Sequence, residues 1–219
     1  MVIYRRSFLW SMTVGIVPAQ TDRTSLGLKE ALTIGLNAAV DLTGRVDGYF
    51  RNEAIKILMP RKLKALVNGL TMIGMRGKVD QFVMTMNRAA EQAAPLAKPI
   101  FAEAIKTFNF NDARGLLAGG DTAITDFFKN KTKEPLGVAF RPPVVEAMGQ
   151  TGATKQFNDL IGRYQKLPFT NKDAVDIEDY VVGKALDGLF YMVAQEESKM
   201  RKNPAARVTS VLREVFGRR

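Results

Sequence analysis

The chain has 219 residues, with 32 lysines and arginines against 22 aspartates and glutamates, and its formal net charge is +10 at pH 7. It contains neither cysteine nor histidine. These absences exclude Ser-His-Asp and Cys-His catalysis, thiolate-bound iron-sulfur clusters, His-ligated haem and the usual Cys/His zinc sites. We therefore expect no cofactor and no metal site, and stability has to come from packing because disulfides cannot form.

The first twenty residues have the pattern of an export signal. Arg5 and Arg6 precede a short, mostly apolar run, and Val17 and Ala19 stand at positions −3 and −1 of a cut after Ala19. This arrangement predicts a twin-arginine signal, removal of the segment and a periplasmic location. Two alternatives stay open: an ordinary secretory signal that carries two arginines, and an uncleaved anchor in the inner membrane. No later segment reaches the roughly twenty apolar residues that a transmembrane helix needs.

The remaining chain, residues 21–219, is expected to form one all-α domain, a multi-helix bundle of irregular topology with at most one minor short strand pair. The reason is that apolar residues recur at three- and four-residue spacing in nearly every segment. The first helix is predicted over residues 25–43, where Gly44 would end it. Its expected buried positions are Leu28, Leu32, Leu36, Ala39 and Val40.

A turn-rich link over residues 44–48 follows, and residues 55–59 are the only strand-like stretch. Pro60 suits the start of the next helix. A long helical segment over residues 78–106 should be kinked or divided by Pro95 and Pro99, because an interior proline removes a backbone hydrogen bond. Further helices are predicted over residues 111–117, 121–128, 142–148, 155–165, 177–202 and 205–216, of which 177–202 is expected to be the longest without interruption.

The predicted helix over residues 177–202 carries a polar stripe beside its apolar face. Tyr180, Lys184, Asp187 and Tyr191 follow one another at spacings of four, three and four, which places them on one side of the helix. They are either a proton donor and acceptor that face a ligand, or a structural ion pair on a half-exposed face. Because the neighbouring positions are apolar, we expect Lys184 and Asp187 to form a linked, largely buried pair.

A second candidate group combines an amide, a guanidinium and a carboxylate. Asn87, Arg88 and Glu91 lie within one helical turn of each other, so they could bind a ligand together. The alternative is an Arg-Glu pair on a solvated face, which contributes little to stability. Residues 196–197 with Arg201 have the spacing of the same kind of surface pair.

The basic excess lies mainly in residues 56–78 and 201–219. An exported basic protein meets anionic lipids, cell-wall polymers and lipopolysaccharide, and the chain has no groove-reading motif. We therefore expect a lipid or other amphipathic ligand, or an anionic envelope component, as the partner, and we do not expect nucleic acid. The oligomeric state stays open.

Several unrelated strings occur in order along the chain: GLKEAL (27–32), DGY (47–49) within residues 44–60, MNRAAE (86–91), KALDGLF (184–190) and NPAAR (203–207). On these strings the chain resembles the bacterial family named domain of unknown function 4197, over nearly all of its length after the signal. The resemblance implies an exported, mostly helical bacterial protein. It supplies no catalytic residues.

Three kinds of function are compatible with these observations. The first, which we favour, is a non-enzymatic periplasmic protein that binds an apolar or amphipathic ligand or an envelope partner. The second is an enzyme that uses Lys184, Asp187 and a tyrosine, and the third is a purely structural or interaction protein. An enclosed apolar cavity would favour the first, a polar cleft at Asp187 the second, and a closed, dry core the third.

Overall fold

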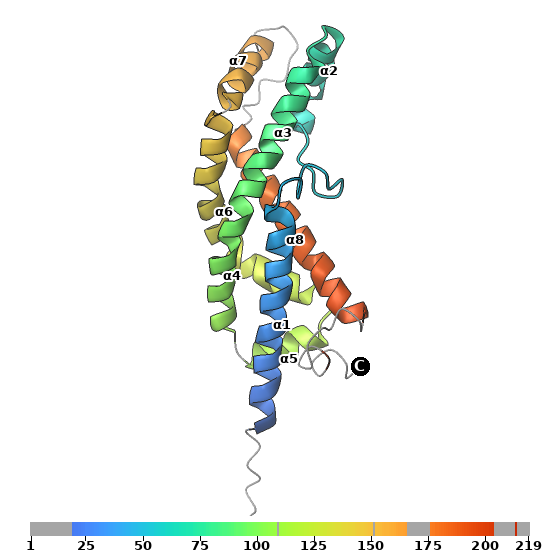
Figure 1. Cartoon of the computed structure of the whole chain (residues 1–219), viewed down its shortest axis with the longest axis vertical. Coiled ribbons are helices and arrows are strands. Elements are labelled where there is room, and N and C mark those ends of the chain that lie inside the picture. Colours follow the sequence, from blue (N-terminus) through green and yellow to red (C-terminus); the bar gives the residue numbers. More distant parts are fainter. Residues whose placement is uncertain (1–18, 109, 151, 166–175, 204–212, 214–219) are drawn as a thin grey trace, which may run out of the picture.

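The computed structural model describes residues 19–108, 110–150, 152–165, 176–203 and 213. Within this part of the chain all regular structure is helical, which confirms the prediction of an all-α fold (Figure 1). In chain order the elements are α1 (Ala19–Gly44), η1 (Arg61–Leu63), α2 (Lys64–Met72), α3 (Arg76–Ala93), η2 (Ala94–Leu96), α4 (Ala97–Lys106), α5 (Phe110–Ala118), α6 (Ala123–Gln150), α7 (Ala153–Gln165) and α8 (Ile177–Lys202).

Two sequence predictions concern segments that lie mostly outside the described residues. Of the predicted export signal, residues 1–18 lie outside them, and of the helix predicted over residues 205–216, all residues except position 213 lie outside them.

The helices form an elongated bundle in which α1, α3, α4 and much of α6 run along the long axis, while α8 crosses them obliquely (Figure 1). α6 packs mainly against α8 and α3, and α1 packs mainly against α8 and α4. α8 therefore packs against both α6 and α1. Its buried side is formed by Ile177, Val181, Val182, Ala185, Leu186, Gly188, Leu189, Phe190, Val193, Glu197 and Met200.

The first helix begins before the predicted start at Ser25 and ends at Gly44. The five positions predicted to face the core are at most 2% exposed, which confirms the periodicity argument. A loop of residues 45–60 follows α1 and folds back against α3 and α8. Within it the strand-like residues 55–59 pair with no strand among the described residues.

The predicted interruption by two prolines is confirmed. α3 ends at Ala93, the 3-10 helix η2 contains Pro95, and α4 begins at Ala97 with Pro99 in its first turn. A proline in the first turn costs no hydrogen bond, since the first N–H groups of a helix have no partner within it.

The prediction of separate helices over residues 121–128 and 142–148 is wrong, because both belong to the continuous helix α6, which has 28 residues and is longer than α8. Pro135 and Pro142 lie on its exposed side and Pro143 is half-buried. The backbone carbonyls that lose their N–H donors to these prolines therefore lie mostly toward water. The buried residues recur every fourth position: Ile124, Phe128, Thr132, Leu136, Phe140, Val144 and Met148. This buried stripe, apolar except for Thr132, continues past the prolines and packs against α8 and α3.

Candidate functional site

The group predicted on α3 comes together with the loop of residues 45–60. The Glu91 side chain is 4% exposed, and its Oε1 accepts hydrogen bonds from the backbone N–H groups of Tyr49 at 3.0 Å and Phe50 at 3.1 Å. Arg88 lies 2.5 Å from Oε2 of Glu91 and 2.6 Å from Oδ1 of Asp47. The hydrogen bond to Glu91 raises the pKa of the Arg88 guanidinium. The Glu91 carboxylate is therefore buried, and the alternative of an Arg-Glu pair on a solvated face is wrong for Glu91.

Asn87 explains why a strand-like segment forms no sheet here. Its Oδ1 accepts a hydrogen bond from the N–H of Ile57 at 2.8 Å, and its Nδ2 donates one to the carbonyl of the same residue at 2.8 Å. The side-chain amide thus takes the place of a neighbouring strand for Ile57. Nδ2 also donates to the carbonyl of Val83 at 2.7 Å.

Tyr49 fastens the same loop to α8. Its ring is fully buried, and its hydroxyl donates a 2.6 Å hydrogen bond to the carbonyl of Ala185. Burial, and next the charge of Glu91, raise the pKa of the Tyr49 phenol far above its ordinary value. Gly188 makes room for the ring, because a Cβ at this position would lie 2.5 Å from Cε1 of Tyr49.

No buried side-chain nitrogen or oxygen in the described part of the chain lacks a hydrogen-bond partner. The cluster around Glu91 consequently presents no buried polar group that a ligand would have to satisfy. Its geometry is that of a structural network, which fixes the loop of residues 45–60 between α3 and α8.

The polar stripe on α8 lies at the surface, and our prediction of a largely buried pair is wrong. Nζ of Lys184 lies 3.0 Å from Oδ2 of Asp187, yet the two side chains are 48% and 57% exposed. Tyr191 is also exposed, whereas the Tyr180 hydroxyl donates to the carbonyl of Leu58 at 2.9 Å. Burial raises the pKa of Tyr180, and the charge of Lys184 acts in the opposite direction. The Lys184–Asp187 pair is therefore a solvated contact within one helix.

A buried ion pair does occur on α8, at the residues that the spacing had assigned to the surface. Glu197 and Arg201 have side chains that are 1% and 4% exposed and lie 2.8 Å apart. The Glu197 carboxylate accepts hydrogen bonds from the N–H groups of Ile124 at 3.1 Å and Thr125 at 2.9 Å, in the first turn of α6. Arg201 also donates to the carbonyl of Leu116 at 2.8 Å. A carboxylate at the start of a helix satisfies N–H groups that have no partner within the helix.

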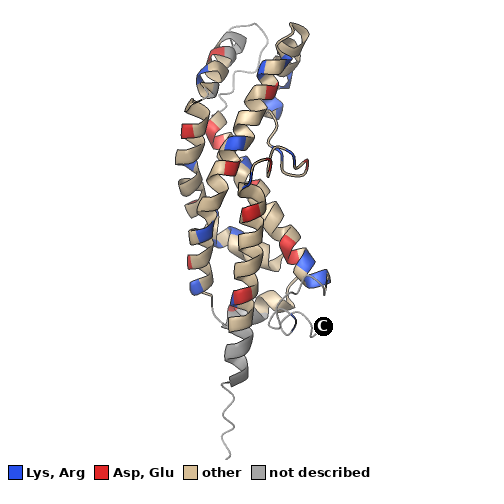
Figure 2. Ribbon diagram, in the orientation of Figure 1, with Lys and Arg blue, Asp and Glu red and all other residues tan. Residues whose placement is uncertain are grey.

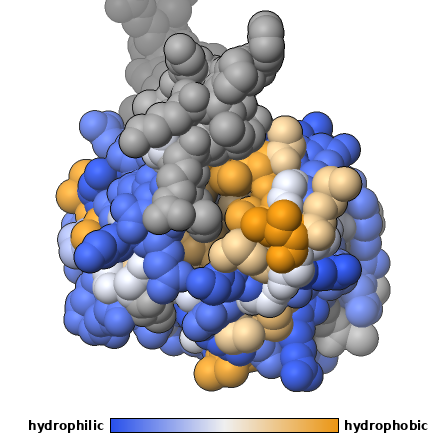
Figure 3. Space-filling view, turned by 90° about the horizontal axis from the view of Figure 1, so that it is seen from above, coloured by the Kyte–Doolittle hydropathy of each residue, from blue (hydrophilic) through white to orange (hydrophobic). Residues whose placement is uncertain are grey.

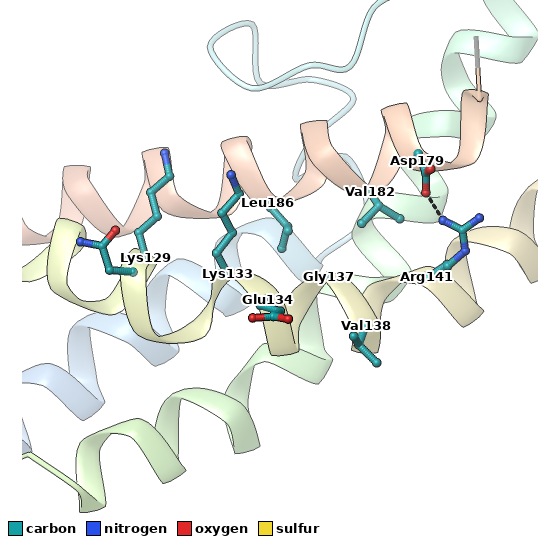
Figure 4. A pocket seen from close by; sticks show the side chains of 10 residues that line it. Lys129, Lys133, Glu134, Gly137, Val138, Arg141, Asp179, Val182 and Leu186 are labelled. Carbon is teal, nitrogen blue, oxygen red and sulfur yellow. Dashed lines mark hydrogen bonds and ion pairs between the residues drawn. The ribbon is translucent and has the colours of Figure 1, made fainter. Parts of the chain in front are cut away.

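A groove of about 630 Å³ lies between α6 and α8 (Figure 4). Its lining residues are Lys129, Asn130, Lys133, Glu134, Gly137, Val138 and Arg141 from α6, and Asp179, Val182 and Leu186 from α8. Gly137 lies opposite Leu186, because a Cβ at Gly137 would make an ordinary contact of 3.9 Å with Cδ1 of Leu186. The lining is therefore apolar in the middle, with charged side chains around it.

The two ends of the groove differ in charge. At one end Arg141 forms an ion pair with Asp179, so the charges there neutralise each other. At the other end Lys129 and Lys133 extend from α6 toward α8 (Figure 4), and neither forms an ion pair with a described residue. The ammonium of Lys129 lies 6.0 Å from the centre of the Phe190 ring. Glu134 also lines the groove next to Lys133, so this end carries two positive charges and one negative charge beside an apolar surface.

Sequence reasoning did not identify the groove. Lys129 and Lys133 are four residues apart, which is a signal for one helix face. The predicted helices covered residues 121–128 and 142–148, so Lys129, Lys133 and Arg141 all lay between them, and α8 supplied residues outside the predicted stripe. The predicted ligand residues on α3 and α8 are not among those that line the groove.

No helix among the described residues combines the length and the apolar character required to cross a membrane. No curated protein and no solved structure matches the chain. The family described as a protein of unknown function (DUF4197) matches residues 19–217. Because this match covers nearly the whole chain, and the fold is all-α as the resemblance implied, the protein belongs to the DUF4197 family.

Proposed function

We propose that the protein is a non-enzymatic binding protein for an anionic amphiphile, a molecule with an acidic headgroup and a hydrocarbon chain. The observation that carries this proposal is the pair of lysines at one end of the groove between α6 and α8. Neither ammonium has a carboxylate partner among the described residues, and both lie beside apolar lining. An acidic headgroup would supply the missing countercharge through charge-assisted hydrogen bonds.

The difference between the two ends gives the ligand a direction. The headgroup lies at Lys129 and Lys133, and the hydrocarbon chain runs over Gly137, Val182 and Leu186 toward the ion pair of Arg141. The volume of about 630 Å³ is in the range of small-molecule sites. Contact between hydrocarbon and the apolar lining adds free energy in proportion to the area removed from water.

The headgroup contact is tested with dodecanoate, titrated calorimetrically below the concentration at which it forms micelles. Replacement of both lysines, Lys129→Gln with Lys133→Gln, should weaken binding at least about tenfold, since hydrogen bonds to charged groups contribute about 1.5 to 3 kcal/mol. Lys131→Gln is the matched control, because Lys131 is on the same helix, lies against the Phe127 ring and does not line the groove. Equal affinity in the double variant and the control would overturn the proposal.

The apolar contact is tested separately with an exposed residue of the groove. Val138 is 72% exposed, so Val138→Asp places a carboxylate beside the hydrocarbon chain without disturbing the core. This variant should bind dodecanoate clearly more weakly. Val145→Asp, on the same helix and outside the groove, should not. If both variants bind like the wild type, the chain does not lie in this groove.

We further propose that the protein acts in the periplasm after removal of its first residues. Supporting this is the order of Arg5 and Arg6, a short apolar run and a small residue at the cut after Ala19. N-terminal sequencing of periplasmic protein should find a start near Gln20. A chain that keeps Met1 in the cytoplasm would contradict the proposal. Replacement of both arginines by lysine should block the twin-arginine route and leave ordinary secretion largely intact.

A further inference from the structure

The connection between α2 and α3 forms one tip of the elongated molecule (Figure 1). The N–H of Gly74 donates to the carbonyl of Thr71 at 3.1 Å, and the N–H of Met75 donates to that of Leu70 at 2.8 Å. Gly74 has a φ of +79°, the left-handed conformation that favours glycine. This hydrogen-bond pattern is a Schellman motif, so the tip has a defined backbone shape.

Two large apolar side chains at this tip have no part in the core. Leu70 is buried and Met75 is partly buried against the core, in keeping with the apolar contact that often accompanies a Schellman motif. Met72 and Ile73 between them are 87% and 70% exposed. Figure 3, which views the molecule from above, shows exposed apolar side chains next to hydrophilic ones. The fold therefore presents apolar surface here that it does not use itself.

Basic side chains lie on both helices that lead to the apolar tip. Residues 61–80 contain Arg61, Lys62, Lys64, Arg76 and Lys78 against a single acidic residue, Asp80. All five basic side chains are exposed. Arg76 and Lys78 are in the first turn of α3, beside the tip, whereas the other three are at the far end of α2, and Figure 2 shows Lys and Arg along both helices below the tip. Arg76 pairs weakly with Asp80, at 3.7 Å, and the segment keeps a clear positive excess. An anionic surface would meet both features at once.

We propose that the α2–α3 tip docks the protein on an anionic lipid bilayer, with Met72 and Ile73 inserted among the headgroups and Arg76 and Lys78 beside them in contact with lipid phosphates. A protruding tip with two apolar side chains offers little area to a protein partner, whereas a fluid interface closes around it. Basic residues near an anionic membrane each strengthen binding. This surface is distinct from the groove, so the inference does not depend on the proposed ligand.

Insertion is tested with a reporter at the tip, because the chain has no cysteine and a single introduced thiol can be labelled selectively. The full chain carrying Ile73→Cys is labelled with nitrobenzoxadiazole and mixed with vesicles of phosphatidylglycerol and phosphatidylcholine. Its emission should shift to the blue and increase. Leu96→Cys is the matched control, since Leu96 is exposed and lies beyond the other end of α3. Its emission should stay that of a label in water.

All variants keep residues 1–20, so any membrane affinity of that segment is the same in each and does not move the tip reporter specifically. If the Ile73 and Leu96 labels respond alike, the tip does not insert and the proposal is overturned. The proposal also fails if the Ile73 label responds equally to vesicles of phosphatidylcholine alone, because the basic residues would then have no role.

The charge contribution is measured by sedimentation with the same anionic vesicles. Arg76→Gln together with Lys78→Gln, in the chain labelled at Ile73, should reduce partitioning at least about tenfold, from roughly fivefold for each basic residue. Lys131→Gln, on α6, should leave it unchanged. The Ile73→Cys chain and the Arg76→Gln, Lys78→Gln chain should both bind dodecanoate with the affinity of the wild type. Vesicle binding therefore tests the proposed membrane contact of the tip, and dodecanoate binding tests the proposed ligand site in the groove.

Discussion

Two ion pairs on α8 have nearly the same spacing and opposite surroundings. Lys184 and Asp187 are three residues apart and about half exposed, whereas Glu197 and Arg201 are four apart and almost completely buried. Spacing, together with the apolar positions next to Lys184 and Asp187, predicted the opposite burial for the two pairs. The comparison teaches that spacing decides whether two charges meet on a helix, and that the neighbouring helices decide whether water reaches them.

The buried pair is stable because its surroundings satisfy it. The Glu197 carboxylate meets the N–H groups of Ile124 and Thr125 and the Thr125 hydroxyl, the last at 2.8 Å. Arg201 has the Leu116 carbonyl as a second acceptor. Burial of charge is costly unless such partners are present. Glu197 therefore joins α8 to the start of α6, while the Lys184–Asp187 ion pair stays within its own helix.

The largest effect is expected for Glu197→Ala. The substitution leaves the Arg201 charge without its carboxylate and removes the acceptor for two N–H groups of α6. Loss of one partner from a buried pair costs about 3 to 5 kcal/mol in the free energy of unfolding. Urea unfolding measures this loss. Glu103→Ala on α4 serves as control, because Glu103 pairs with Lys106 and both side chains are mostly exposed, so this loss should be less than about 1 kcal/mol. Equal losses in the two variants would contradict the burial of Glu197.

The second-largest loss of stability is expected for Gly188→Ala, and Gly183→Ala on the same helix is its comparison. In Gly188→Ala the new Cβ would lie 2.5 Å from Cε1 of Tyr49 and 3.1 Å from Cβ of Ile55. Since Tyr49 is buried and hydrogen-bonded, the ring cannot move freely, and overpacking of this kind costs about 1 to 3 kcal/mol. At Gly183 no atom lies within 4 Å, so Gly183→Ala should stabilise the helix by up to about 1 kcal/mol. Thermal unfolding of both variants should shift in opposite directions. A stabilised Gly188→Ala variant would rule out the tight contact with Tyr49.

A smaller effect is expected from the Tyr49 hydroxyl, and it depends on pH. Tyr49→Phe loses one buried hydrogen bond to α8, which costs about 1 kcal/mol near neutral pH. In the wild type the pKa of Tyr49 in the folded protein is raised above its ordinary value, so the unfolded chain releases this proton first as the pH rises. The stability that Tyr49 contributes is therefore complete below about pH 10 and declines above it, by about 1.4 kcal/mol for each further pH unit.

Urea unfolding at about pH 8 and about pH 11 tests this sign, with the difference between wild type and Tyr49→Phe as the quantity of interest. Other groups titrate equally in both proteins and cancel in that difference. The advantage of the wild type should disappear at the higher pH. A constant difference would mean that the Tyr49 phenol is not buried in its neutral form.

The smallest effect is expected for the exposed pair. Lys184→Ala and Asp187→Ala should each cost less than about 1 kcal/mol, and their effects should nearly add in a double-mutant cycle. The weak coupling follows from the solvent around both side chains. A coupling comparable to that expected for Glu197 and Arg201 would remove the contrast between the two pairs.

Periodicity in the sequence was sufficient for the helices and for much of the core. The buried face of α1 and the limits of α8 were predicted correctly, because apolar spacing and capping signals act over a few residues. The limits of α6 were not, since three interior prolines are strong local signals against a helix. Contacts of its apolar stripe with α8 and α3 outweighed them.

For the candidate sites, too, some features followed from local helix spacing and others from tertiary packing. The sequence by itself determined that Asn87, Arg88 and Glu91 share one face of a helix, and that Lys184 lies within reach of Asp187. Only the tertiary structure decided that a loop some forty residues away in sequence covers Glu91, that α6 covers Glu197, and that α8 places apolar residues opposite Lys129 and Lys133. Helix spacing is a local property with a fixed period, whereas burial of a charge depends on which distant segment packs against that face.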